Sequence, residues 1–146
     1  RSEKNIRDGI RNAVKNTGLR GRWEIISQKP MTIADTGHNE AGIKEIVKQL
    51  KKMKYKHLHF VLGVVGDKDP SNVLKVLPKN ATYYFCKAKL PRAMDVDELR
   101  GRAGKSGLQG NSYRSVKLAL KAAQKTAGKN DLIFVGGSTF VVAEVI

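Results

Sequence analysis

The sequence predicts a three-layer α/β fold, in which helices cover both faces of a mostly parallel sheet that begins with an antiparallel strand or hairpin. Two kinds of segment predict it. HLHFVLGVV (residues 57–65) and DLIFV (131–135) are nearly continuous apolar runs, which are typical of strands buried on both faces. Amphipathic helical segments alternate with such runs along the chain, and this alternation favours parallel strands joined by helices.

The first half of the chain contains two predicted helices and a predicted hairpin. Residues 3–16 carry apolar side chains at helical spacing and end at the glycines of TGLRG, which predicts a helix. RWEIISQKP (22–30) and MTIA (31–34) are two short strand segments, with Trp23 and Ile25 on one face of the first, and the KPM turn between them favours a hairpin. A second helix is predicted over residues 40–54.

The second half continues the alternation. Asp69 before Pro70 is a favourable helix opening, because proline at the first helical position loses only a donor that would be unpaired anyway. The remaining predictions are a short helix SNVLKVL (71–77), a strand ATYYFC (81–86), helices over 95–104 and 111–131, the strand DLIFV, and a closing helix TFVVAEVI (139–146).

The chain has 146 residues and a formal net charge of +15, so it fits one basic domain. Because it begins with Arg1 and ends in an apolar run, we expect it to be part of a longer polypeptide. The lysines of the 40–54 helix lie opposite its apolar positions, and no aromatic residues are interleaved with them. Solvation or attraction of an anionic small molecule is therefore favoured over nucleic-acid binding.

Cysteine and histidine usage limits the class further. The single cysteine, Cys86, cannot form an internal disulfide, and no apolar stretch has the length of a membrane span, so the sequence indicates a reduced, cytoplasmic protein without a membrane partner. His57 and His59 alternate, and we interpret them as ring side chains on one face of a strand end rather than as a metal pair. No metal site is predicted.

Polar clusters follow four of the predicted strands, and ligands of open parallel sheets bind beyond the carboxyl ends of strands. These clusters are DTGHN (35–39), GDKD (66–69), KAKLPRA (87–93) and GGS (136–138). Within them, His38 could bind a phosphate or carboxylate at a helix start, Ser138 adds a hydroxyl, and Arg92 suits an anion. Asp35 and Asn39 have an alternative role as helix caps, and for Asn39 capping and ligand contact are equally supported.

GRAGKSG (residues 101–107) looks like the end of a phosphate-binding loop, but that motif needs a glycine where Leu99 stands and a preceding strand. We expect a basic loop between two elements instead. No nucleophile has an evident base beside it, so this domain by itself lacks the parts for phosphoryl transfer.

Taken together, GRW, the Asp-x-x-His-Asn group, DKD, PRA and the late GGS resemble, in order and spacing, the C-terminal domain of folylpolyglutamate and dihydrofolate synthases, members of the Mur ligase superfamily. The resemblance covers nearly the whole chain. It implies a Rossmann-like C-terminal domain over residues 19–146, preceded by a linker helix over residues 1–18.

The resemblance further implies an ATP-dependent ligase that activates a folate or dihydropteroate carboxylate as an acyl phosphate and joins it to L-glutamate. Arg22, Asp35 and Asn39 would contact ATP, His38 would be the catalytic group near the terminal phosphate and the incoming glutamate, and Ser138 would belong to the glutamate site. The ligands of Mg²⁺ are expected in an N-terminal ATPase domain of the same polypeptide, so this domain alone should be inactive.

This sequence departs from the family pattern where Glu40 replaces the usual proline after the asparagine, which leaves the helix start intact but places a carboxylate beside an anion site. The serine motif also reads GGST. Two alternatives stay open: a lobe of a Mur-type peptide ligase for cell-wall precursors, and a basic nucleic-acid-binding α/β domain.

Overall fold

A computed structural model describes residues 21–66 and 69–146 of the chain. It contains a six-stranded sheet with the strand order β1-β2-β6-β3-β4-β5. The strands are β1 (Glu24–Gln28), β2 (Met31–Asp35), β3 (Leu58–Leu62), β4 (Thr82–Phe85), β5 (Gln109–Ser112) and β6 (Leu132–Gly136). Only β1 runs antiparallel, and it pairs with β2 as the predicted hairpin.

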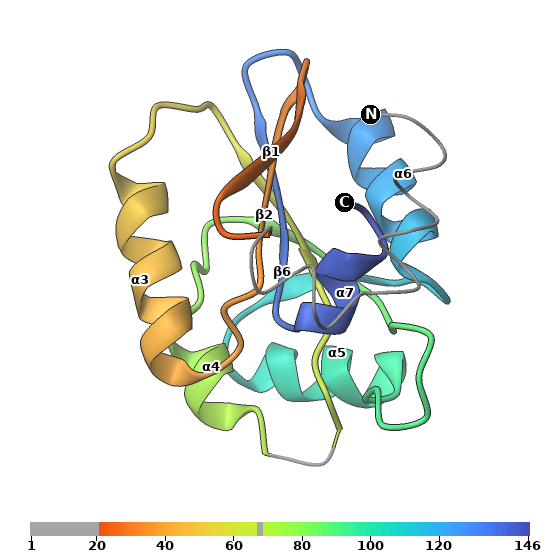
Figure 1. Ribbon diagram of the computed structural model, residues 1–146. Coiled ribbons are helices and arrows are strands. Elements are labelled where there is room, and N and C mark those ends of the chain that lie inside the picture. The colour runs from red at the N-terminus through yellow and green to blue at the C-terminus, as the bar shows by residue number, and fades with distance from the viewer. Residues whose placement is uncertain (1–20, 67–68) are drawn as a thin grey trace.

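Helices cover both faces of this sheet (Figure 1). They are α3 (Glu40–Lys51), α4 (Ser71–Val76), α5 (Val96–Lys105), α6 (Val116–Thr126) and α7 (Thr139–Ala143). One core cluster packs α3, α4 and α5 against one face, and a second packs α6 and α7 against the other. The predicted three-layer α/β fold is confirmed. The predicted helix over residues 3–16 and the linker over 1–18 lie outside the described residues.

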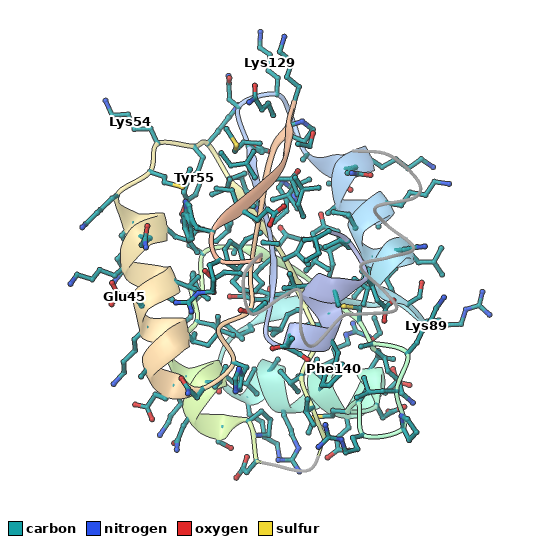
Figure 2. The ribbon with its side chains drawn as sticks, viewed as in Figure 1. Glu45, Lys54, Tyr55, Lys89, Lys129 and Phe140 are labelled. Carbon is teal, nitrogen blue, oxygen red and sulfur yellow. The ribbon has the colours of Figure 1, made fainter. Side chains whose placement is uncertain are left out.

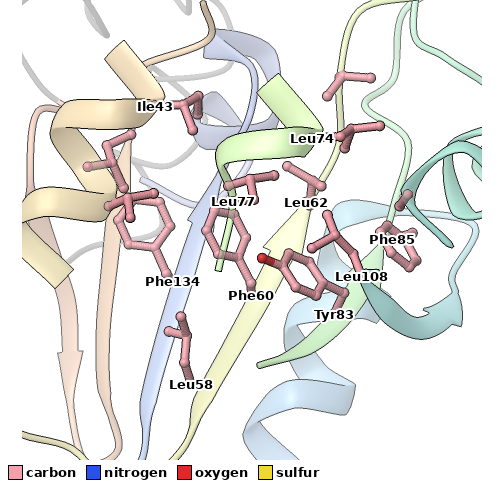
Figure 3. Close-up of a cluster of buried hydrophobic side chains, with 14 of the residues drawn as sticks. Ile43, Leu58, Phe60, Leu62, Leu74, Leu77, Tyr83, Phe85, Leu108 and Phe134 are labelled. Carbon is pink, nitrogen blue, oxygen red and sulfur yellow. The ribbon is translucent and has the colours of Figure 1, made fainter. Parts of the chain in front are cut away.

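The first core cluster is built around aromatic rings that project from neighbouring strands (Figure 3). Phe60 of β3 lies 5.0 Å from the ring of Phe134 on β6 and 5.3 Å from the ring of Tyr83 on β4, measured between centroids. Every residue of β3 and β6 is buried, as the apolar runs predict for central strands. Burial of apolar area at roughly 25 cal/mol per Å² makes such packing strongly stabilising.

Three local predictions are wrong. The QGNS segment is a strand, β5, whereas the sequence predicted a helix over 111–131 that in fact begins at Val116. Residues 101–105 belong to α5, and only Ser106 and Gly107 form a turn, so the expected basic loop is not present. Trp23 precedes β1 and has a φ of 51°, so it is not on a strand face.

Candidate functional site

The carboxyl ends of the central strands meet at one edge of the sheet, which we call the carboxyl edge. Asp35 at the end of β2 and Leu62 at the end of β3 both pair with Gly136 of β6. The loops that follow these three strands therefore converge, as strand-end reasoning predicts. The strand-end clusters DTGHN and GGS are brought together here.

Asp35 connects this edge to the segment before β1 through hydrogen bonds of its carboxylate. Its side chain is largely buried, Oδ2 accepts a hydrogen bond from the backbone N–H of Trp23 at 2.9 Å, and Oδ1 accepts one from Gly37 at 2.8 Å. Thr36 adds a backbone hydrogen bond to the carbonyl of Gly21 at 2.8 Å. Asp35 is thus not a cap of α3; it fixes the relative position of the segment before β1 and the loop after β2.

Sequence reasoning missed the role of Trp23. A φ of 51° lies in the left-handed region, which costs free energy for a residue with a bulky side chain. The hydrogen bond from its N–H to Asp35 and the tilted packing of its ring on Phe134, with centroids 5.8 Å apart, hold this conformation. No periodicity or motif signals a backbone conformation of this kind in advance.

Arg22 lies next to Asp35, and its guanidinium group is exposed to solvent. Its Nε is 4.0 Å from Oδ2 of Asp35, and its side chain is 74% exposed, against 12% for Asp35. An ion pair with one exposed partner contributes little to stability. The arrangement instead leaves a guanidinium available to an anion at the carboxyl edge, so its predicted contact with ATP stays a prediction with suitable geometry.

His38 and Asn39 occupy the loop between β2 and α3. Oδ1 of Asn39 accepts a hydrogen bond from the N–H of Gly42 at 2.8 Å, so Asn39 is the N-cap of α3. His38 is exposed, and its Nδ1 lies 3.3 Å from the carbonyl oxygen of Thr36. Because a carbonyl only accepts, this contact requires the hydrogen on Nδ1 and leaves Nε2 of the neutral ring as an acceptor.

A cleft of about 270 Å³ opens beside these two residues. Its walls come from three loops, and they comprise His38, Asn39 and Glu40 before and in α3, Val64, Val65, Asp69, Pro70, Asn72 and Val73 around the start of α4, and Gly137 after β6. Ligand pockets usually measure about 300–1,000 Å³. The volume of this cleft falls just below that range.

Several of these lining residues were not singled out from the sequence. Val64, Asn72 and Val73 carry no motif, and only the position of their loop after β3 could have pointed to them. Asp69 belongs to the predicted strand-end cluster GDKD and does line the cleft. Strand-end position was thus a better guide than residue type.

Gly137 and Ser138 shape the far side of the carboxyl edge. Gly137 has a φ of 101°, and a Cβ there would lie 2.4 Å from the carbonyl oxygen of Gly63, so only glycine fits. Ser138 is buried and caps α7, its Oγ accepting from the N–H of Phe140 at 3.1 Å. Gly137 rather than Ser138 lines the cleft, and the glutamate-binding role of Ser138 stays a prediction.

Arg92 lies farther along the same side. Its guanidinium carbon is 5.9 Å from the ring centroid of Phe140 on α7, and its backbone carbonyl accepts from the N–H of Gly66. The structure therefore packs Arg92 against α7, while the cleft is lined by other residues. Anion binding by Arg92 stays a prediction.

Glu40, the departure from the family pattern, is engaged by a neighbour. Its Oε2 lies 2.8 Å from Nζ of Lys44, one helical turn later, and the hydrogen bond and charge of Lys44 lower the pKa of Glu40. α3 begins at Glu40, so the substitution leaves the helix start intact, as predicted. The ion pair reduces the repulsion that an isolated carboxylate would exert on an anion in the cleft.

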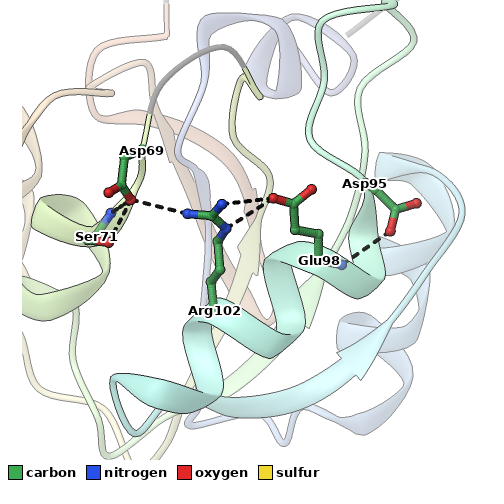
Figure 4. Close-up of polar contacts among 5 residues, drawn as sticks. All are labelled: Asp69, Ser71, Asp95, Glu98 and Arg102. Atoms are coloured by element: carbon green, nitrogen blue, oxygen red, sulfur yellow. Dashed lines mark hydrogen bonds and ion pairs between the residues drawn. The ribbon is translucent and has the colours of Figure 1, made fainter.

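The α4 wall of the cleft is tied to α5 by a polar cluster (Figure 4). Oδ1 of Asp69 accepts from the hydroxyl of Ser71 at 2.6 Å and from its N–H at 3.0 Å, and these two bonds lower the pKa of Asp69. The guanidinium group of Arg102 on α5 forms ion pairs with both Asp69 and Glu98. Its Nη1 lies 3.3 Å from Oδ1 of Asp69, and its Nη2 lies 3.0 Å from Oε2 of Glu98. These contacts are exposed, so they orient the wall more than they stabilise the fold.

Metal and thiol chemistry find little support in the described part of the chain. It holds no group of three histidine, cysteine or carboxylate side chains that could bind a metal ion. Cys86 is fully buried, and burial raises the pKa of its thiol, so it is unsuited to act as a nucleophile. Between residues 21 and 146, gap at 67–68 aside, no helix is long and apolar enough to cross a bilayer.

The chain is similar to known folate ligases over nearly all of its length. Dihydrofolate synthase/folylpolyglutamate synthase of Escherichia coli (strain K12) is 33% identical over 148 residues, which cover 99% of this chain and 33% of that protein. A probable bifunctional folylpolyglutamate synthase/dihydropteroate synthase of Haloferax volcanii is 30% identical, covering 94% of this chain and 16% of that protein. The chain thus spans a third or less of the length of these relatives.

Solved structures give the same result. E. coli FolC in complex with ADP, without folate substrate, superposes with a TM-score of 0.78 and 30% identity, covering 86% of this chain and 30% of that one. A bifunctional folylpolyglutamate synthase/dihydrofolate synthase with Mn, AMPPNP and L-glutamate bound gives a TM-score of 0.76 and 26% identity, over 87% of this chain and 30% of that one. Residues 21–139 match the family of the Mur ligase, glutamate ligase domain. The chain therefore belongs to the Mur ligase family, as a domain of the kind found in folylpolyglutamate and dihydrofolate synthases.

Proposed function

We propose that this domain is one lobe of a cytoplasmic, ATP-dependent ligase that joins L-glutamate to folate or dihydropteroate. In the proposed reaction, a carboxylate oxygen of the substrate attacks the γ-phosphorus of ATP, the acyl phosphate forms, and ADP leaves with the electron pair of the broken P–O bond. The amine of glutamate then attacks the acyl carbon, phosphate leaves with the C–O electron pair, and the amine loses a proton. The cleft that carries His38 and Asn39 at the carboxyl edge is the observation that carries the proposal.

The residues of this edge fit an anionic nucleotide. Arg22 presents an exposed guanidinium, and Asp35 holds the segment that carries it through the N–H of Trp23. We propose that Arg22 and Asp35 bind ATP, with Asn39 contributing its amide group beside the cap. Because the chain spans a third or less of its relatives, we expect a second lobe of the same polypeptide, which would supply Mg²⁺ ligands and, on closing, exclude water from the acyl phosphate.

His38 is the proposed catalytic group. With the Nδ1 hydrogen directed at the Thr36 carbonyl, Nε2 can accept a hydrogen from the glutamate amine, or donate to a phosphate oxygen when the ring is protonated. Ser138 and the neighbouring Gly137 backbone are the proposed glutamate side of the site. The hydroxyl of Ser138 caps α7, so Ser138 would hold the start of α7 in position beside the bound glutamate.

Kinetics of the complete enzyme test this proposal. For His38→Ala we expect amide formation from dihydropteroate or tetrahydrofolate and glutamate to slow about 100-fold, with the Kd of the folate substrate changed less than about twofold. Arg22→Gln should raise the KM for ATP. Lys121→Gln on the exposed face of α6 is the matched control. Unchanged turnover of His38→Ala at saturating substrates would remove the catalytic role.

Substrate arms of the same assay address the alternatives. Activity with muramyl peptide precursors but not with folates would assign the domain to a peptide ligase and overturn the folate proposal. A salt-dependent mobility shift of short oligonucleotides at physiological ionic strength, without ligase activity, would favour the nucleic-acid reading.

A further inference from the structure

A second cleft, of about 520 Å³, lies at the opposite edge of the sheet, where the parallel strands begin; we call this the amino edge. This volume falls within the range of about 300–1,000 Å³ that is usual for small-molecule pockets. Lys54, Tyr55 and Lys129, which line this cleft, lie in the upper part of the view, and Phe140 of α7 lies in the lower part (Figure 2). The function proposed above makes no use of this cleft.

The floor of the amino-edge cleft is apolar and aromatic. Met31, Met53 and Tyr55 line it, and all three are partly buried against the first core cluster. Thioethers and a phenol ring give favourable contacts to a flat aromatic group. Burial raises the pKa of Tyr55, so its hydroxyl stays protonated at neutral pH and can donate a hydrogen bond.

Two loops that form the cleft are held together by backbone hydrogen bonds. The N–H of Lys56, after α3, donates to the carbonyl of Asn130, after α6, at 2.8 Å. The N–H of Leu132 donates to the carbonyl of His57 at 3.0 Å. A site that is already ordered loses little conformational entropy when a ligand binds.

The exposed rim of the cleft is positively charged, because its lysines reach solvent while the one carboxylate of its lining is largely buried. Lys54, Lys56 and Lys129 are exposed at its rim. The side chain of Asp131 is 13% exposed, and its Oδ2 accepts from Nε2 of His59 and from the N–H of Gly128, each at 2.9 Å. Asp131 is thus occupied by partners inside the protein, and the ammonium groups of the rim are left to attract an anion.

We propose that the amino-edge cleft binds a small aromatic polyanion, whose ring contacts Tyr55 and the two methionines and whose negative groups contact the three lysines. This proposal does not depend on the ligase function. The charged groups could be the phosphates of a nucleotide or the carboxylates of an aryl oligoglutamate. Both present a planar ring and several anionic oxygens on one small molecule.

Titration of the isotope-labelled 146-residue chain, followed by NMR, tests the proposal with ADP and with p-aminobenzoyl-γ-triglutamate. We expect saturable shifts at Tyr55 and Asn130 for at least one of the two probes, weakened by salt. Lys54→Gln/Lys129→Gln should raise the Kd about tenfold. Lys117→Gln/Lys121→Gln on α6 removes the same charge elsewhere and should change the Kd less than about twofold.

A response to ADP alone would identify phosphate as the bound group, and a response to the triglutamate alone would identify carboxylates. Shifts confined to residues near His38 and Gly137, or a Kd that the lysine pair does not affect, would overturn the proposal. Pyrophosphate binding as tightly as ADP would overturn its aromatic part. Saturable binding of a 12-nucleotide single strand that is tighter than either probe would assign the cleft to nucleic acid instead. Because shifts are read residue by residue, this result is separate from any outcome at the carboxyl edge.

Discussion

The two edges of the sheet both carry a cleft, but they are built by different parts of the chain. At the carboxyl edge, backbone geometry sets the shape: Gly137 has a positive φ, and Asp35 binds two backbone N–H groups. At the amino edge, a buried side-chain network adds to the backbone hydrogen bonds between the two loops, since His59 joins Asp131 to Tyr84 through its two ring nitrogens. An edge of the first kind should be sensitive to the loss of glycine, and one of the second kind to the loss of a single polar group.

The charges of the two edges differ as well. Carboxylates lie at the carboxyl edge, where Asp35, Glu40 and Asp69 each have a hydrogen-bond donor or cation beside them. Lysines lie around the amino-edge cleft. Part of the net charge of +15 is therefore concentrated at the amino edge, away from the proposed nucleotide site.

The largest effect should come from Gly137→Ala. The added Cβ would lie 2.4 Å from the Gly63 carbonyl oxygen and 2.7 Å from Cδ1 of Leu62, at a φ that alanine rarely adopts. We expect the free energy of unfolding to fall by about 2–4 kcal/mol, measured by urea denaturation. In Gly128→Ala at the amino edge, the added Cβ would lie 3.7 Å from its nearest neighbour, Oδ2 of Asp131. This substitution should change the free energy of unfolding by less than about 1 kcal/mol. Equal losses would contradict the distinction between the edges.

A smaller loss is expected for Asp131→Ala. The substitution leaves Nε2 of buried His59 and the N–H of Gly128 without their acceptor, which should cost about 1–3 kcal/mol of unfolding free energy. Asp69→Ala at the carboxyl edge removes a carboxylate whose side chain is 70% exposed and should cost less than about 1 kcal/mol. If Asp69→Ala were the more destabilising of the two, the amino edge would not depend on its buried polar network.

The smallest expected effect is the pH dependence of stability that Asp131 contributes. Hydrogen bonds from Gly128 and from His59 lower the pKa of Asp131 below its ordinary value of 3.8. A lowered carboxyl pKa contributes stability that is present above the unfolded value and is lost as the pH falls through the folded one. Asp131→Asn keeps an oxygen for Gly128 but removes the charge. The difference in unfolding free energy between wild type and this variant should therefore be smaller at about pH 2.5 than at about pH 7, and a constant difference would contradict the assignment.

Much of the fold could be predicted because its central strands have the strongest sequence signal. β3 and β6 are buried on both faces and contain only apolar residues and His59, so their type and their places along the chain were predicted correctly. β5 was missed because QGNS has no apolar residue and lies at the edge of the sheet, where only pairing with β4 makes it a strand. Position 110 needs a glycine, because a Cβ there would overlap the carbonyl oxygen of Tyr83. This is a tertiary contact that local propensity does not encode.

The sequence placed the candidate residues at the edge where the strand ends meet, and their binding roles stay predictions. Parallel topology alone places the ends of β2, β3 and β6 side by side, and this is why Asp35 and His38 were assigned to one edge. The alternatives for Asn39 were resolved only in part, since the cap is present and the residue also lines the cleft. His57 and His59 proved structural: His57 binds Thr82 at 2.7 Å, and the two rings meet edge to face with centroids 5.0 Å apart.

The position of Trp23 has a practical consequence. It is the single tryptophan of the chain, and its ring packs on Phe134 while its amide is held by Asp35. Indole emission will therefore report on the segment before β1 and its packing on β6, next to Arg22 and Asp35, the residues proposed to bind ATP. The chain thus carries one intrinsic fluorescent probe at the carboxyl edge of the sheet.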